Sequence, residues 1–341
     1  MYKLFTFILL CLSVTISIQG NALTSDSIQK STYLYAVKEK DSLYMDRYEL
    51  PSYKDKKKAC IMFVFGGGFV GGSRDRKDYI SYFKHLANKG YSVVSIDYRL
   101  GLKKVAEQAK KEKEKGVEPK KTGALEFLSI FDNTISIAVE DLFDATNYVI
   151  EHADEWNIDK DMIVASGSSA GAITVLHAEY NICNSKELSK KLPKDFNYAG
   201  IISFAGAIFS MEGDLKWAAQ PSPIQLFHGD SDGNVPYDEL RAKILGIKTK
   251  YGFFGSKHIA KQLDKMQYPY YFYDVERATH EIADSPMQKN LNEIDTFLDK
   301  FVRGKENLII NTKVQQPDKP LLKKKFSIKD YLVGNGIGEK E

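Results

Sequence analysis

The sequence predicts an α/β fold built on a mostly parallel central sheet of about eight strands, with helices on both faces. Short apolar segments of strand length alternate along the chain with amphipathic segments of helix length. The composition, with 43% hydrophobic and 27% charged residues, is that of a globular protein with a full core. It excludes a disordered, collagenous or disulfide-scaffold chain.

The predicted elements follow one another in the order that such a fold requires. The run CIMFVF at residues 60–65 is continuous and apolar, which is typical of a strand buried on both faces. Strands are predicted at residues 32–37, 42–50, 60–65, 91–96, 162–165, 201–204, 224–227 and 270–275. Helices are predicted at residues 79–88, 138–149, 172–180, 238–245, 256–265 and 291–301.

The N-terminus, residues 1–22, has the order of a secretory signal peptide. Lys3 precedes an apolar stretch, and the small-residue pattern GNA at residues 20–22 follows it. The apolar stretch is shorter than the ~18 residues of a spanning helix, so we expect export to a periplasmic or extracellular location. We expect no stable membrane span in the mature chain. A lipid anchor on Cys11 is not favoured, because no small residue precedes it.

Residues 23–305 are predicted to form one large domain. Within it, the charged segment 101–137 is predicted to be an insertion at the surface, with a possible role as a lid. Residues 306–341 are predicted to be a polar, basic tail. After signal cleavage only Cys60 and Cys183 remain, and the sequence does not decide whether they are bonded. The net charge of +3 does not favour a nucleic-acid partner.

One sequence window, GSSAG at residues 167–171, fits the pattern G-x-S-x-G. In this pattern a serine nucleophile occupies a sharp turn between a strand and a helix, where side chains larger than glycine would obstruct the turn. A strand is predicted before the window and a helix after it. We therefore expect Ser169 to be exposed as a nucleophile, with the Ala170 N–H at the start of the helix.

A serine hydroxyl needs a base, and His280 is the best candidate among six histidines. It follows the predicted strand 270–275 in a loop, at the sheet edge where open α/β sheets carry their sites. The orienting carboxylate is expected earlier in the chain, in the loop after residues 224–227. Asp230 and Asp232 both lie in that loop, and the residues alone leave the choice open.

A glycine run follows the strand at residues 60–65. Consecutive glycines allow backbone N–H groups to face a substrate oxygen, so Gly67 and Gly68 could join Ala170 in an oxyanion hole. Phe69 and Val70 come next and are predicted to contact the substrate.

Five segments in this order resemble the α/β-hydrolase superfamily, and within it esterases of the hormone-sensitive-lipase and carboxylesterase type. They are FGGGF at residues 65–69, DYRL at 97–100, GSSAG at 167–171, HGDSDGNVP at 228–236 and THE at 279–281. The resemblance implies that Asp232, rather than Asp230, is the acid of a triad with Ser169 and His280. This sequence departs from the family pattern at Phe65, where the family usually has histidine.

The resemblance implies a serine hydrolase that cleaves carboxylic esters and requires no metal or organic cofactor. With the signal peptide predicted at residues 1–22, we expect an exported enzyme that acts on a small-molecule, glycan or lipid ester. An amidase or exopeptidase of the same fold is the first alternative. A non-catalytic ligand-binding protein on this fold is the second, and it is less favoured because all three members of the triad are present. The acyl and alcohol groups of the substrate and the oligomeric state cannot be inferred from the sequence.

Overall fold

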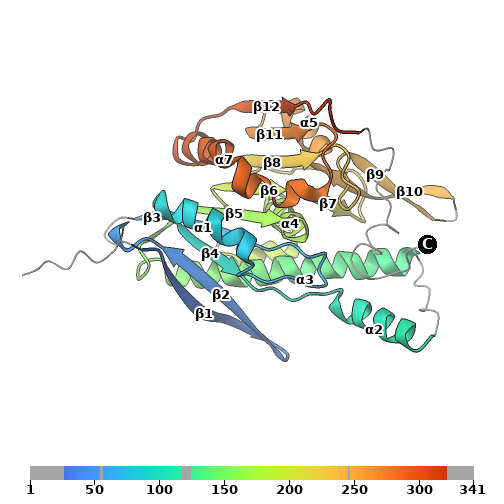
Figure 1. Cartoon of the computed structure of the whole chain (residues 1–341), viewed down its shortest axis with the longest axis horizontal. Helices are drawn as coiled ribbons and strands as arrows, with labels where there is room; N and C mark the ends of the chain where they lie inside the picture. Colours follow the sequence, from blue (N-terminus) through green and yellow to red (C-terminus); the bar gives the residue numbers. More distant parts are fainter. Residues whose placement is uncertain (1–26, 54–56, 117–123, 245, 321–341) are drawn as a thin grey trace, which may run out of the picture.

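The computed structural model describes residues 27–53, 57–116, 124–244 and 246–320, and its centre is a nine-stranded sheet (Figure 1). In spatial order the strands are β1 (Gln29–Lys38), β2 (Asp41–Glu49), β4 (Ser92–Ile96), β3 (Lys58–Val64), β5 (Ile158–Ser168), β6 (Gly200–Phe204), β8 (Ile224–Gly229), β11 (Tyr270–Val275) and β12 (Ile309–Val314). Every neighbouring pair from β4 to β12 is parallel, whereas β1 and β2 pair antiparallel. The predicted fold class is confirmed, with β1 and β12 as the edge strands.

Helices cover both faces of this sheet, and the central strands β3 and β4 are therefore buried on both sides. The longer helices are α1 (Lys77–Asn88), α2 (Lys103–Glu114), α3 (Ala124–Glu151), α4 (Ala170–Cys183) and α5 (Ser256–Lys265). Shorter elements are α6 (Pro286–Lys289), α7 (Leu291–Phe297), a π-helical turn (Leu298–Arg303) and 3₁₀ turns at Pro51–Tyr53, Glu187–Lys191 and His280–Ala283. α1, α6 and α7 pack in a row, and α3 packs beside α4.

A second sheet of three antiparallel strands contradicts one predicted helix. It consists of β7 (Ala207–Ser210), β10 (Ile247–Gly255) and β9 (Glu239–Ile244). The predicted helix at 238–245 is wrong, because residues 239–244 form β9. Leu240, Ala242 and Ile244 alternate with charged residues, which is the two-residue period of a strand.

The segment 101–137 is only partly a surface insertion. Its first half forms α2, whose side chains are mostly exposed. Residues 117–123 lie outside the described residues. The rest begins α3, where Leu128, Phe131 and Ile135 are buried in the core. Their spacing of three and four residues continues to Ala138, so the apolar face of this helix begins ten residues earlier than predicted.

The globular domain also continues beyond residue 305. Ile309–Val314 forms β12, which pairs in parallel with β11, so this part of the predicted tail belongs to the central sheet. The residues after β12 lie against the loop that precedes His280, where Arg277 Nη1 donates to the carbonyls of Pro317 (2.6 Å) and Lys319 (2.8 Å). The remainder of the tail, residues 321–341, and the predicted signal peptide, 1–22, lie outside the described residues.

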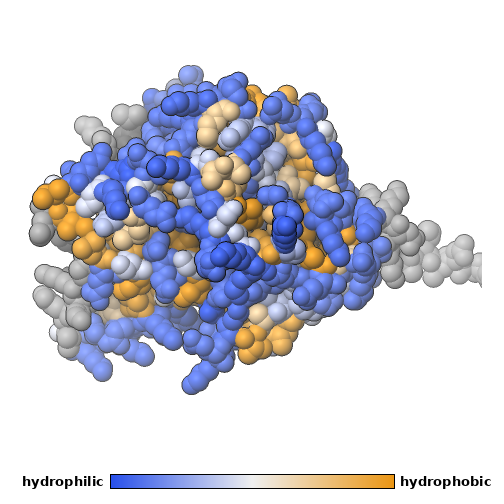
Figure 2. Space-filling view, turned by 180° about the vertical axis from the view of Figure 1, so that it is seen from behind, coloured by the Kyte–Doolittle hydropathy of each residue, from blue (hydrophilic) through white to orange (hydrophobic). Residues whose placement is uncertain are grey.

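The surface seen from behind is mostly hydrophilic, with separate apolar patches between the polar residues (Figure 2). Large apolar side chains that are exposed include Val37 and Ile247. Within the part of the chain that the structure describes, no helix combines the length and the apolar character needed to cross a membrane.

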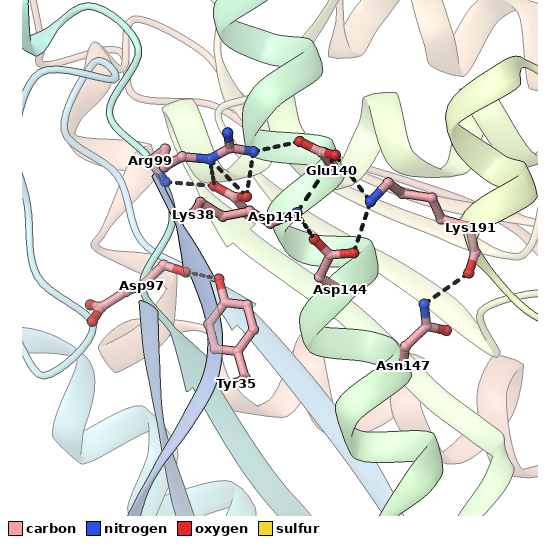
Figure 3. A network of polar contacts seen from close by, with 9 residues as sticks. All are labelled: Tyr35, Lys38, Asp97, Arg99, Glu140, Asp141, Asp144, Asn147 and Lys191. Atoms are coloured by element: carbon pink, nitrogen blue, oxygen red, sulfur yellow. Dashed lines mark hydrogen bonds and ion pairs between the residues drawn. The ribbon is translucent and has the colours of Figure 1, made fainter. Parts of the chain in front are cut away.

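A cluster of charged side chains fastens α3 to the end of β4 (Figure 3). Arg99, of the DYRL segment, donates from Nη2 to Asp141 (2.7 Å) and to Glu140 (2.5 Å), and its backbone N–H also donates to Asp141. Lys191 contacts Glu140 from the opposite side at 3.0 Å. The Asp141 side chain is completely buried, so this arginine compensates a charge that has no access to water.

We expect Arg99→Ala to lower the free energy of unfolding by about 3–5 kcal/mol, because it leaves the Asp141 carboxylate buried without a cation. Lys191→Ala is the matched control. Its side chain is 35% exposed, and its loss is expected to cost about 0–1 kcal/mol. Urea unfolding of both variants measures the difference, and equal losses would contradict the assignment.

The same cluster predicts a dependence of stability on pH. Burial alone would raise the pKa of Glu140, but hydrogen bonds from Lys191 and Arg99 and the charge of Lys38 lower it from 4.5 to about 2. The folded protein therefore binds this proton more weakly than the unfolded chain. The contribution of Glu140 to stability is complete above about pH 4.5 and is lost as the pH falls towards 2.

We therefore expect the free energy of unfolding to fall less steeply in Glu140→Gln than in the parent as the pH falls below about 4.5. Urea unfolding over a series of pH values provides the slopes. Parallel curves for the two proteins would show that Glu140 does not contribute.

Candidate active site

Ser169 lies on the turn between β5 and α4 in a strained conformation, with φ 52° and ψ −114°. Two glycines make the turn possible. A Cβ at Gly167 would lie 2.3 Å from the carbonyl oxygen of Gly171, and a Cβ at Gly171 would lie 2.0 Å from that of Val64. The Ser169 N–H donates to the Phe204 carbonyl at 2.9 Å, which ties the turn to β6. The chain thus makes a tight turn between β5 and α4 at residues 167–171, here called the elbow, which exposes the serine.

The structure brings Ser169, His280 and Asp232 together from three different loops. Ser169 Oγ is 2.8 Å from His280 Nε2, and His280 Nδ1 is 2.8 Å from Asp232 Oδ2. His280 begins the 3₁₀ turn after β11, and Asp232 lies in the loop after β8. The His280 side chain is 23% exposed, whereas that of Asp232 is completely buried. This arrangement allows a proton to move between the serine and the imidazole beside a fixed negative charge.

The Asp232 carboxylate is surrounded by donors. Oδ1 accepts the backbone N–H groups of Asn234 (2.7 Å) and Val235 (3.0 Å), and His228 Nε2 lies 3.3 Å from Oδ2. Burial alone would raise the pKa of Asp232, but the charge of His280 and the hydrogen bonds from His228 and His280 hold it well below its ordinary value. The carboxylate is therefore ionised at neutral pH.

Among the described residues, Asp230, the other aspartate of this loop, makes no hydrogen bond or ion pair with His280. Its Oδ1 accepts the backbone N–H of Arg277 at 2.6 Å. This contact joins the loop after β8 to the loop after β11. Asp230 therefore holds together the two loops that carry Asp232 and His280.

The glycine loop runs directly past Ser169. A Cβ at Gly66 would lie 3.1 Å from the Cβ of Ser169, and Gly67 and Gly68 adopt φ values of 140° and 62°. Ala170 is the first residue of α4, where helix geometry leaves the backbone N–H without an acceptor within the helix. Gly66 of this loop therefore lies beside the serine, and the oxyanion hole of Gly67, Gly68 and Ala170 stays a prediction.

Tyrosine hydroxyls support the glycine loop at the point where Phe65 departs from the family pattern. Tyr98 OH donates to the Phe65 carbonyl at 2.9 Å, and the Gly66 N–H donates to Tyr79 OH at 3.2 Å. The Phe65 ring also packs on Tyr98, with ring centroids 4.5 Å apart. Backbone hydrogen bonds to these tyrosines therefore fix the loop without a histidine.

The structure does not support direct substrate contact by Phe69. This side chain is completely buried and packs against Phe131, with centroids 5.9 Å apart. The turn closed by the Val70 N–H on the Gly67 carbonyl directs Phe69 into the core. Val70 is half-buried, so its predicted contact with substrate stays a prediction.

Arg76 and Asp284 lie near the site but were not identified from the sequence. Asp284 Oδ1 accepts from Arg76 Nη2 at 2.5 Å and from Ser168 Oγ at 3.3 Å. Asp284 follows the turn that begins at His280, so these contacts connect the histidine loop to α1 and to the elbow. The partners are more than 100 residues apart in sequence, and no local pattern identifies them.

His177 and the two cysteines of the described residues are buried. His177 accepts the Phe209 N–H on Nε2, and burial, with a contribution from Lys186, lowers its pKa to about 3. Cys60 and Cys183 are both buried free thiols. Over the described ranges, no three His, Cys, Asp or Glu side chains are grouped so that they could hold a metal ion.

Comparisons with known proteins agree with this fold. The BD-FAE family model, which represents an esterase family of the α/β hydrolases, matches residues 45–113 and 124–211. Apo esterase 2 of Thermogutta terrifontis is similar, with a TM-score of 0.54 at 20% identity over 79% of this chain and 94% of that chain. Its butyrate-bound form gives a TM-score of 0.55 at 20% identity over 79% and 93%. No curated protein matches the sequence.

The chain therefore has the fold of these esterases, and its match to the BD-FAE family model over residues 45–113 and 124–211 supports a carboxylic ester hydrolase. The matched region includes the glycine loop and the elbow, but it ends before Asp232 and His280. The narrower resemblance to the hormone-sensitive-lipase type stays a prediction.

We expect Tyr98→Phe to lower the free energy of unfolding by about 1–3 kcal/mol and to reduce kcat, because it leaves the buried Phe65 carbonyl without its donor. Tyr91→Phe is the matched control. Tyr91 is also buried, but its hydroxyl has no hydrogen-bond partner among the described residues. Thermal unfolding and ester hydrolysis compare the two variants, and similar effects in both would contradict a specific role of Tyr98.

Proposed function

We propose that the protein is an exported serine esterase that forms an acyl-enzyme on Ser169. The observation that carries the proposal is the continuous contact from Ser169 Oγ through His280 to Asp232, with both distances at 2.8 Å. In this proposal His280 is the general base and Asp232 orients and stabilises it.

The reaction proceeds in two steps. Ser169 Oγ attacks the ester carbonyl carbon while its proton passes to His280 Nε2. The oxyanion that forms accepts hydrogen bonds from the backbone N–H groups of Gly67, Gly68 and Ala170. The bond to the alcohol oxygen then breaks, and His280 returns the proton to the leaving alcohol. Water attacks the acyl-enzyme with His280 again as base, which releases the acid and restores the serine.

The substrate is proposed to be a small-molecule, glycan or lipid ester. Thermogutta esterase 2 is described with propionate and with butyrate bound, and after phosphorylation by paraoxon. These descriptions concern that protein, but they select short acyl esters as first substrates and paraoxon as a first covalent probe. Anilides of the same acids test the amidase alternative.

Export is part of the proposal and rests on residues 1–22. Expression of the full chain in a bacterial host, followed by fractionation and sequencing of the mature N-terminus, tests it. A mature protein that starts near Leu23 outside the cytoplasm is expected, and retention of Met1 in the cytoplasm would overturn this part.

We expect Ser169→Ala to reduce kcat for p-nitrophenyl acetate and butyrate by about 10⁶-fold, because the nucleophile is lost. Paraoxon should add one phosphoryl group to the parent and none to the variant, as measured by intact mass. Ser166→Ala is the matched control. Ser166 lies near the end of β5, just before the elbow, but unlike Ser169 it is buried, and its substitution should leave kcat close to that of the parent. Full activity in Ser169→Ala would overturn the proposed function.

A further inference from the structure

A second imidazole lies against the triad carboxylate. His228 Nε2 is 3.3 Å from Asp232 Oδ2, the same oxygen that His280 Nδ1 contacts at 2.8 Å. The side chains of His228 and Asp232 are both completely buried. Among the described residues, the carboxylate has four polar contacts: two backbone N–H groups on Oδ1 and two imidazoles on Oδ2.

The surroundings of His228 decide which ring nitrogen carries a proton. Nε2 faces Asp232 Oδ2 and the carbonyl oxygen of Val235, both at 3.3 Å. A carbonyl oxygen and an ionised carboxylate can only accept hydrogen bonds, so Nε2 must be the donor. His228 thus presents an N–H to the same carboxylate oxygen that orients His280.

The opposite edge of the ring is also fixed. His228 Nδ1 is 2.8 Å from Ser256 Oγ at the start of α5, and Ser256 Oγ lies 3.2 Å from the carbonyl of Gly206. The Tyr237 ring packs against the imidazole edge to face, with centroids 5.6 Å apart. Contacts from α5, from the loop after β8 and from the turn between β6 and β7 leave the ring little freedom to move.

We propose that His228 is a positioning residue of the esterase reaction, which holds Asp232 Oδ2 where it meets His280 Nδ1. The inference rests on the proposed function of the triad. Oδ1 is anchored by two backbone groups, but rotation of the carboxyl plane still moves Oδ2. The Nε2–H of His228 restricts this rotation and thereby fixes the orientation of the general base.

Two amide substitutions separate this role from simple packing. In His228→Gln, the side-chain amide reaches the position of Nε2, so it can still donate to Asp232. In His228→Asn, the amide reaches only the position of Nδ1, so the contact with Ser256 can persist while that with Asp232 is lost. We expect kcat to fall about 10–100-fold in His228→Asn, with KM unchanged and much of kcat retained in His228→Gln. Equal kcat values in the two variants would overturn the proposal.

A double-mutant cycle tests whether the effect passes through the carboxylate. In an Asp232→Asn background, His228→Asn should reduce kcat by much less than it does in the parent. His177→Gln serves as the control, since this buried histidine accepts the Phe209 N–H and, among the described residues, makes no hydrogen bond or ion pair with Asp232. Its kcat should stay close to that of the parent. Additive effects of His228→Asn and Asp232→Asn would contradict the proposal.

Proton NMR of the full chain provides a readout that does not depend on turnover. The His280 Nδ1–H and the His228 Nε2–H should both give low-field imidazole signals that change in Asp232→Asn. His228→Asn should remove one signal and shift the other. An unshifted His280 signal would overturn the positioning role, even if the triad is active. Full activity of Ser169→Ala together with a shifted signal would instead overturn the proposed function alone.

Discussion

The close backbone contact between the elbow and the end of β3 is the constraint on which the rest of the site depends. The α-carbon of Gly171 lies so near the Val64 carbonyl that a methyl group there would overlap it. β3 and β5 are hydrogen-bonded neighbours with Val64 opposite Gly167. A residue larger than glycine at position 171 would therefore push the end of β3 away from the turn that carries Ser169. The positive φ of Ser169 persists because this packing and the bond to Phe204 hold the turn from both sides.

The order of strands in the sheet also brings Asp232 and His280 close to each other. β8 and β11 are parallel neighbours with Gly229 opposite Val275, so the loops that follow them leave the sheet side by side. Backbone bonds from Asp230 to Val275 and from Ser231 to Ala278 then join these loops before either functional side chain is reached. The meeting of Asp232 and His280 is therefore a consequence of strand register, and the side-chain hydrogen bonds complete it.

The sequence was most informative where chemistry requires a particular residue in a particular turn. The G-x-S-x-G pattern and the glycine run could be interpreted because only glycine fits those backbone positions. The choice of Asp232 over Asp230 needed the resemblance, since both are polar residues in one loop. The ion pair of Arg76 with Asp284 depends on how distant elements pack, which no local pattern encodes. His228 and Asp232 are only four residues apart, but their contact depends on the conformation of the loop between them. β9 and the start of α3 were missed although their periodicities are present, because charged residues between the apolar positions obscured them.

Two buried carboxylates in this protein are compensated in different ways, and the difference bears on function. Asp141 is paired with Arg99, whose charge is permanent, so its negative charge is already balanced. Asp232 is held by backbone N–H groups and imidazoles, which stabilise an anion without a permanent cation beside it. When His280 takes the serine proton, the Asp232 carboxylate, 2.8 Å from His280 Nδ1, stabilises the imidazolium. A permanent cation in place of His228 would oppose this stabilisation, because two positive charges would then share one carboxylate.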